Sequence, residues 1–102
     1  MPRAITLSPA AEEDLEAIRA WLTQPGSGPR AWSRRKAITQ AIRDLVRHPC
    51  RHPIGEHEGV RERPVEGHRI LYVVAPDTGT DRTAGDVLVL RVFGPGQSRE
   101  HL

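Results

Sequence analysis

Two arginines stand among aliphatic residues in the second half of the chain. Arg69 lies in the segment HRILYVVA (68–75), and Arg91 lies in DVLVLRVF (86–93). A guanidinium group offers a planar fork of donors that fits carboxylates and phosphates. The two side chains could therefore stabilise charge on a reacting phosphate, bind an acidic partner, or reach solvent from the wet face of a sheet. The elements that position them decide between these three interpretations.

A second set of reactive side chains lies in residues 48–58, HPCRHPIGEHE. Its potential metal ligands are His48, Cys50, His52, Glu56, His57 and Glu58. A structural zinc site normally has two pairs of ligands at fixed spacing, whereas this segment has a single thiol and two prolines that hinder a compact cage. We interpret it as a polar surface loop and predict no metal. We predict no nucleotide or redox cofactor either.

The elements follow from periodicity and from capping residues. Residues 3–7 alternate as a short strand, and Ser8 and Pro9 suit the start of a helix that runs to Leu22. Residues 24–29, QPGSGP, break that helix, and a second helix follows from Pro29. Three strands are predicted at 60–65, 68–75 and 86–93, the first two joined by a two-residue hairpin turn at 66–67.

This order predicts an α+β fold, with residues 1–102 as one domain. A helical hairpin should pack on one face of a small, mostly antiparallel sheet, in the order strand, helix, helix, strand, strand, strand. Trp21 and Trp32, near the helix–helix turn, are expected to close the end of the core.

The other face of the sheet is predicted to be uncovered. Because side chains alternate along a strand, Arg69 should share this face with Leu71 and Val73. By the same rule Arg91 should share it with Val87, Val89 and Phe93, while the helices cover Ile70, Tyr72, Val74, Leu88, Leu90 and Val92. A monomer seldom leaves such an apolar patch bare, so we expect a partner to bind there.

The chain has a slight positive charge of +2, and all but one of its 15 cationic side chains, Lys36, are arginine. The second helix carries many of them on its exposed side: Arg30, Arg34, Arg35, Lys36, Arg43 and Arg47. This pattern fits either a solvated helix face or a surface for an acidic partner. The single cysteine fits a reducing compartment, and no run approaches the ~20 apolar residues that span a bilayer. We expect a cytoplasmic protein without a membrane partner.

Several segments in this order resemble one known family. LSPAAEEDLEAIRAWL (7–22), LVRHP (45–49), VRERPVEGHRILYVV (60–74) and DVLVLRVFG (86–94) are similar to the ParE/RelE superfamily of bacterial toxins, the toxin halves of type II toxin–antitoxin pairs. The resemblance covers nearly the whole chain and implies a RelE/ParE-like fold. It also implies a cognate antitoxin with an acidic C-terminal segment. The toxin would then contact operator DNA only indirectly, through the antitoxin.

The superfamily has two kinds of target. RelE-like members cleave messenger RNA in the ribosome, and this alternative would make Arg69, Arg91 and Arg99 catalytic cations. That branch also has a basic residue after the last strand and a terminal Tyr or His. Here Pro95 and Gly96 stand where the basic residue is expected and no tyrosine follows, although Arg99 and His101 lie nearby on a short tail. We therefore favour the ParE-like branch, which blocks DNA gyrase without chemistry of its own. An inactive family member that only binds antitoxin is the third alternative.

The resemblance and the predicted faces together give a set of binding residues. We expect the target or the antitoxin to contact eight residues: Arg69, Leu71, Val73, Val89, Arg91, Phe93, Arg34 and Arg35.

Overall fold

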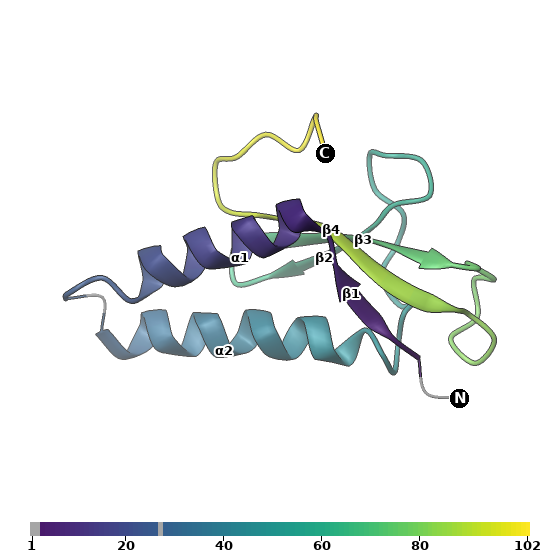
Figure 1. Ribbon diagram of the computed structural model, residues 1–102, viewed down its shortest axis with the longest axis horizontal. Helices are drawn as coiled ribbons and strands as arrows, with labels where there is room; N and C mark the ends of the chain where they lie inside the picture. The colour runs from purple at the N-terminus through teal and green to yellow at the C-terminus, as the bar shows by residue number, and fades with distance from the viewer. Residues whose placement is uncertain (1–2, 27) are drawn as a thin grey trace.

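The computed structural model describes residues 3–26 and 28–102 and has the predicted element order (Figure 1). The elements are β1 (Ile5–Leu7), α1 (Pro9–Leu22), α2 (Gly28–Asp44), β2 (Arg61–Val65), β3 (His68–Ala75) and β4 (Asp86–Phe93). The four strands form one mixed sheet in the order β1-β4-β3-β2, with β1 parallel to β4 and the other pairs antiparallel. The predicted α+β fold is confirmed.

Local chemistry explains where the elements begin and turn. Ser8 caps α1 because its side chain accepts a hydrogen bond from the Ala11 amide at 3.0 Å, and its hydroxyl donates to the Leu90 carbonyl at 2.7 Å. The hairpin between β2 and β3 turns at Glu66 and Gly67, whose φ angles of 49° and 75° are both positive. Two positive φ angles are what the favoured two-residue hairpin turn requires, so this prediction is also correct.

A β-bulge in β4 overturns the predicted faces of that strand. The pairing with β3 passes from Leu71↔Arg91 to Tyr72↔Val89, so Leu90 has no partner across the ladder. An extra residue on one strand reverses the alternation on one side of it. Val87 and Val89 therefore pack under the helices, and Leu88 and Leu90, predicted there, do not belong to that core.

Two apolar clusters hold the layers together. The larger lies between the helices and the sheet and includes Ile38, Leu45, Ile70, Tyr72 and Val89. The smaller lies on the opposite face of the sheet, where Val60, Leu71 and Phe93 are buried with Val73 and Leu90 packed against them. The predicted uncovered face is thus partly a second core.

The helical hairpin extends past the edge of the sheet, and its tip has no strand beneath it (Figure 1). Trp21 and Trp32 are accordingly 69% and 53% exposed. The expectation that they close the core is wrong, and Lys36 instead lies over the Trp32 ring at 4.4 Å. Within residues 3–26 and 28–102, neither helix combines the length and the apolar character needed to cross a membrane.

Candidate binding surface

The sheet face opposite the helices is covered by two segments of the chain itself. Figure 1 shows the C-terminal tail and the loop before β2 on the side of the sheet away from α2. His57 Nε2 donates to the Arg99 carbonyl at 2.5 Å, which joins the loop to the tail. Leu71 and Phe93 beneath are only 0% and 4% exposed. These two predicted binding residues are not accessible while the tail and the loop lie in place.

A buried carboxylate fixes this cover. Glu62, whose side chain is 6% exposed, accepts a hydrogen bond from Arg99 Nη1 at 3.0 Å and another from the Glu56 amide at 3.1 Å. Arg99 also pairs with the Glu56 side chain at 3.2 Å. Charge-assisted hydrogen bonds of this kind are stronger than neutral ones, so the tail is anchored by a connected ion cluster.

Arg69 lies at the margin of the same cluster. Its Nη1 is 3.8 Å from Glu62 Oε1, and its side chain remains 45% exposed. Val73, on the same strand, is half-buried. Of the predicted sheet residues, Arg69 therefore keeps the most freedom to bind a partner. Val89 is fully buried on the helix side, so its predicted place on this face is wrong.

Arg91 has a different environment from the one predicted. Its Nε and Nη2 donate to the two carboxylate oxygens of Asp14 at 2.7 and 2.9 Å, and the same carboxylate accepts the Val92 amide at 2.9 Å. The hydrogen bond to Asp14 raises the pKa of Arg91, and its guanidinium lies 4.5 Å from the Phe93 ring centre. Arg91 thus ties α1 to β4 and does not emerge freely on the far face.

The helix cations Arg34 and Arg35 lie in two different hollows. Arg35 lines a groove of about 550 Å³ between α1 and α2, whose apolar lining comes from Leu7, Leu15, Ile18 and Ile38. The charged lining of this groove, which we call the interhelix groove, is Glu12, Glu16, Arg19, Arg35, Lys36 and Arg43. Arg34 lines a hollow of about 410 Å³ beside Trp21, His68 and Pro95. The eight predicted binding residues therefore do not form one surface.

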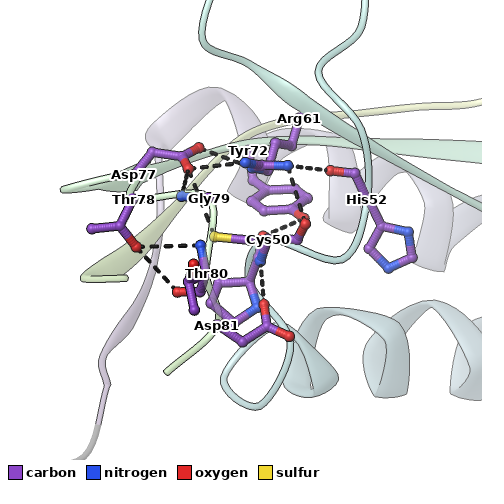
Figure 2. A network of polar contacts seen from close by, with 10 residues as sticks. Cys50, His52, Arg61, Tyr72, Asp77, Thr78, Gly79, Thr80 and Asp81 are labelled. Carbon is purple, nitrogen blue, oxygen red and sulfur yellow. Dashed lines mark hydrogen bonds and ion pairs between the residues drawn. The ribbon is translucent and has the colours of Figure 1, made fainter. Parts of the chain in front are cut away.

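A further polar network, which the sequence interpretation missed, joins two loops around Arg61 of β2 (Figure 2). Arg61 donates to both oxygens of Asp77 at 2.8 and 2.9 Å, and to the carbonyls of His52 and Cys50 at 2.8 and 3.2 Å. The Tyr72 hydroxyl donates to the Pro49 carbonyl at 2.7 Å, and burial raises the pKa of Tyr72 to about 12. The network holds the loop after α2 against the loop that joins β3 to β4.

This network also sets the protonation state of the Cys50 thiol. Burial, and then the nearby Asp77 carboxylate, raise the pKa of Cys50. A raised pKa disfavours the thiolate, which is the reactive form. In the described ranges 3–26 and 28–102 there is also no cluster of three or more His, Cys, Asp or Glu side chains arranged to hold a metal ion.

Comparison with known proteins places this geometry in a family. The family described as the ParE toxin of type II toxin–antitoxin systems, parDE, matches residues 5–97. The chain belongs to the ParE toxin family. A comparison with curated proteins found no match.

Two solved structures share the RelE/ParE-like fold. One is a chromosomal ParDE system from P. aeruginosa, with a TM-score of 0.70 and 16% identity over 92% of this chain and 97% of that chain. The other is the RelBE2 toxin–antitoxin complex from Mycobacterium tuberculosis, with a TM-score of 0.59 and 21% identity over 92% of this chain and 99% of that one. Within this fold, the bulge and the anchored tail decide which side chains of the ParE-family chain reach the surface.

The three arginines of the nuclease alternative are not brought together in this ParE-family toxin. Arg69 and Arg99 meet at Glu62, whereas Arg91 is held by Asp14 on α1. His68, close in sequence to Arg69, is buried, and its Nδ1 bonds to the Glu66 carbonyl at 2.9 Å. That contact lies within the hairpin turn and gives this histidine a structural role.

Proposed function

We propose that this ParE-family toxin inhibits DNA gyrase by binding to it, without a chemical step of its own, and that a cognate antitoxin neutralises it. The observation that carries the proposal is the pairing of Arg91 with Asp14. Arg91 is one of the three cations of the nuclease alternative, and its guanidinium is already bound to a carboxylate of the chain. Family membership supports the same conclusion.

The state of Glu62 supports binding over catalysis as well. RNA cleavage at a ribose 2′-hydroxyl needs a base for the proton and cations for the developing charge on phosphorus. Glu62 is the carboxylate nearest to Arg69, yet one of its oxygens accepts from Arg99 and the other from the Glu56 amide. A carboxylate with both oxygens engaged is a poor proton acceptor.

Arg69 is the residue we expect to matter most for the target. Arg69→Ala should weaken inhibition of gyrase supercoiling by about tenfold, because a hydrogen bond to a charged group is worth about 1.5–3 kcal/mol. The matched control is Arg82→Ala, which removes the same charge from the exposed loop between β3 and β4 and should change inhibition by less than about twofold.

The same purified protein should leave messenger RNA intact on programmed ribosomes. Cleavage of the message that disappears in Arg69→Ala would overturn the proposal and establish the nuclease alternative. No effect in either assay, with the antitoxin still bound, would favour an inactive family member.

We further propose that the acidic segment of the antitoxin binds as a helix in the interhelix groove. The apolar residues that line the groove offer contact area to the apolar face of such a helix. Four cations, Arg19, Arg35, Lys36 and Arg43, and two acids, Glu12 and Glu16, give the lining a net positive charge. Complementary charge of this kind mainly raises the association rate and sets orientation.

Addition of an antitoxin strand at the edge of β2 is the alternative mode of binding, and it is disfavoured. The Glu62 amide on the outer edge of β2 already donates to the Pro53 carbonyl at 3.1 Å, and the Gly55 amide donates to Val60 at 2.9 Å. Pro64 has no amide hydrogen to offer. An edge with its donors used or absent is a poor template for another strand.

Arg43→Glu tests the groove. This exposed side chain lines the groove near the end of α2, and its reversal should weaken binding of a cognate antitoxin by about tenfold at low salt. The control is Arg30→Glu, at the exposed start of α2 and outside the groove, which should have a much smaller effect. Equal losses in calorimetric titrations of both variants would show that the antitoxin reads the general charge of α2 and not the groove.

A further inference from the structure

A small basic hollow lies at the C-terminal end of α2 and shares no lining residue with the interhelix groove. It has a volume of about 190 Å³ and is lined by Asp44, Arg47, His48, Arg51, His52 and Arg63. We call it the basic hollow. Its residues come from the last turn of α2, from the loop after it and from β2. Side chains from three segments therefore surround one concavity.

The arginines of the basic hollow are not paired with carboxylates, unlike several other arginines of the chain. Arg61, Arg91 and Arg99 each pair with a carboxylate within 3.2 Å. Within residues 3–26 and 28–102, by contrast, Arg47, Arg51 and Arg63 form no ion pair. The only carboxylate in the lining, Asp44, accepts a hydrogen bond from the Gln40 amide at 2.9 Å. The hollow thus concentrates three unpaired guanidinium groups.

Arg63 carries the sharpest signal. Its Nε is buried and has no hydrogen-bond partner among the described residues. A buried donor without a partner costs about 1–3 kcal/mol and needs an explanation. Arg61, two residues earlier on the same face of β2, has all three of its guanidinium nitrogens satisfied. The contrast shows that the guanidinium of Arg63, a residue that lines the hollow, is not fully satisfied within the described part of the chain.

His52 fits the same interpretation. Its Nε2 lies 2.9 Å from Arg63 Nη1 and accepts a hydrogen bond from it, so this nitrogen carries no proton. Burial lowers the pKa of His52, and the charges of Arg63 and Arg51 lower it further. The imidazole is thus held neutral by surrounding positive charge, and it orients Arg63 without neutralising it.

The arginines are not needed to cap α2. Cations often bond to the last carbonyls of a helix, but here backbone amides already do so. The amides of Leu45, Val46 and Arg47 donate to Ile42, Arg43 and Asp44 at 3.1–3.2 Å. The side chains of Arg47 and Arg51 are exposed and remain available to a ligand.

We propose that the basic hollow binds a phosphate group of a nucleic-acid backbone. Three guanidinium forks around one hollow match an oxyanion with several acceptor oxygens, whereas a single carboxylate is satisfied by one fork. Lys and Arg contacts to phosphates supply most of the sequence-independent affinity for nucleic acids. The chain would then make its own contact with DNA or RNA, in addition to any contact made through an antitoxin.

Binding of a fluorescein-labelled 12-base-pair duplex, followed by fluorescence anisotropy over a salt series, tests the proposal. Arg51→Gln and Arg63→Gln should each weaken binding about tenfold and reduce the slope of log K against log salt by about 1. Arg63→Lys, which keeps the charge but loses the fork, should give an intermediate loss. Arg51 is exposed, so its variant tests the site even if Arg63→Gln lowers stability.

The control is Arg30→Gln, which removes the same charge at the other end of α2. Equal weakening by Arg30→Gln would mean diffuse attraction to a basic protein and would overturn the proposal. Inorganic phosphate alone should shift the NMR signals of His52 in the wild type but not in Arg63→Gln. If phosphate shifts His52 and the duplex does not bind, the hollow takes a free phosphate and the nucleic-acid assignment fails. If Arg63→Gln weakens only the antitoxin complex, the hollow serves a protein carboxylate and the proposal also fails.

Discussion

Arg61→Ala is expected to lower the free energy of unfolding by about 3–5 kcal/mol, the range for removing one partner of a buried ion pair. The Arg61 and Asp77 side chains are 11% and 23% exposed, so solvent screens their pairing only partly. The substitution also leaves the carbonyls of Cys50 and His52 without their donor. Urea denaturation at neutral pH measures the loss. Arg82→Ala, in the exposed loop, is the control and should be close to wild type.

The dependence of stability on pH gives this prediction a second measurement. The hydrogen bond from Arg61 lowers the pKa of Asp77 below its usual value. Because the folded pKa is the lower one, the pairing adds stability that is present above the unfolded pKa of about 3.9 and is lost as the pH falls through the folded pKa. Arg61→Ala should therefore unfold with a flatter acid limb than the wild type. A loss below about 1 kcal/mol with an unchanged acid limb would place this pair among weak surface ion pairs.

Local features of the sequence were sufficient to predict the order of the elements. Ser8 marks the start of α1 because its side chain can accept a hydrogen bond from the first turn, and Pro9 because it has no amide hydrogen to leave unpaired there. Glu66-Gly67 marks a hairpin turn because a glycine tolerates the positive φ angle that such a turn requires. Such signals depend on a few neighbouring residues. The apolar periodicity then requires the helices to cover the sheet, and the α+β layering follows.

The faces of β4 could not be predicted in the same way. Strict alternation placed Val89 on the far face and Leu90 under the helices, but the bulge reverses both positions. A bulge depends on how two strands pair, and Val-Leu-Val-Leu offers equally apolar side chains to either face. Neither register is favoured by the residues of β4 alone.

The partners of the arginines were also beyond the sequence pattern. Arg91 pairs with Asp14, 77 positions away, and Arg99 with Glu62, 37 positions away. The sequence identified the arginines as unusual but gave no means to separate those paired within the chain from Arg63, which is not. One signal was available in the sequence. Glu62 stands between Arg61 and Arg63 in a predicted strand, and a carboxylate that becomes buried in a strand needs a charged or hydrogen-bonding partner within the protein.

Leu71→Ala is expected to lower the free energy of unfolding by about 2–5 kcal/mol, as deletion of a fully buried leucine side chain generally does. Leu71 is 0% exposed and forms the second core with Val60 and Phe93. The cavity would lie under the tail and the loop before β2, which the Glu62 cluster fixes in place. The expected result is early melting in thermal and urea denaturation.

Leu90→Ala is the matched comparison, because it removes the same atoms from the neighbouring strand. Leu90 is only partly buried against the second core, so its loss should cost clearly less, about 1–2 kcal/mol, since less apolar area returns to water. If Leu90→Ala is instead the more damaging substitution, Leu90 lies under the helices and the bulge is absent from the protein in solution. If both substitutions are nearly neutral, the far face is open to solvent and the tail does not cover it. That result would restore the predicted uncovered face of the sheet as a binding surface around Arg69.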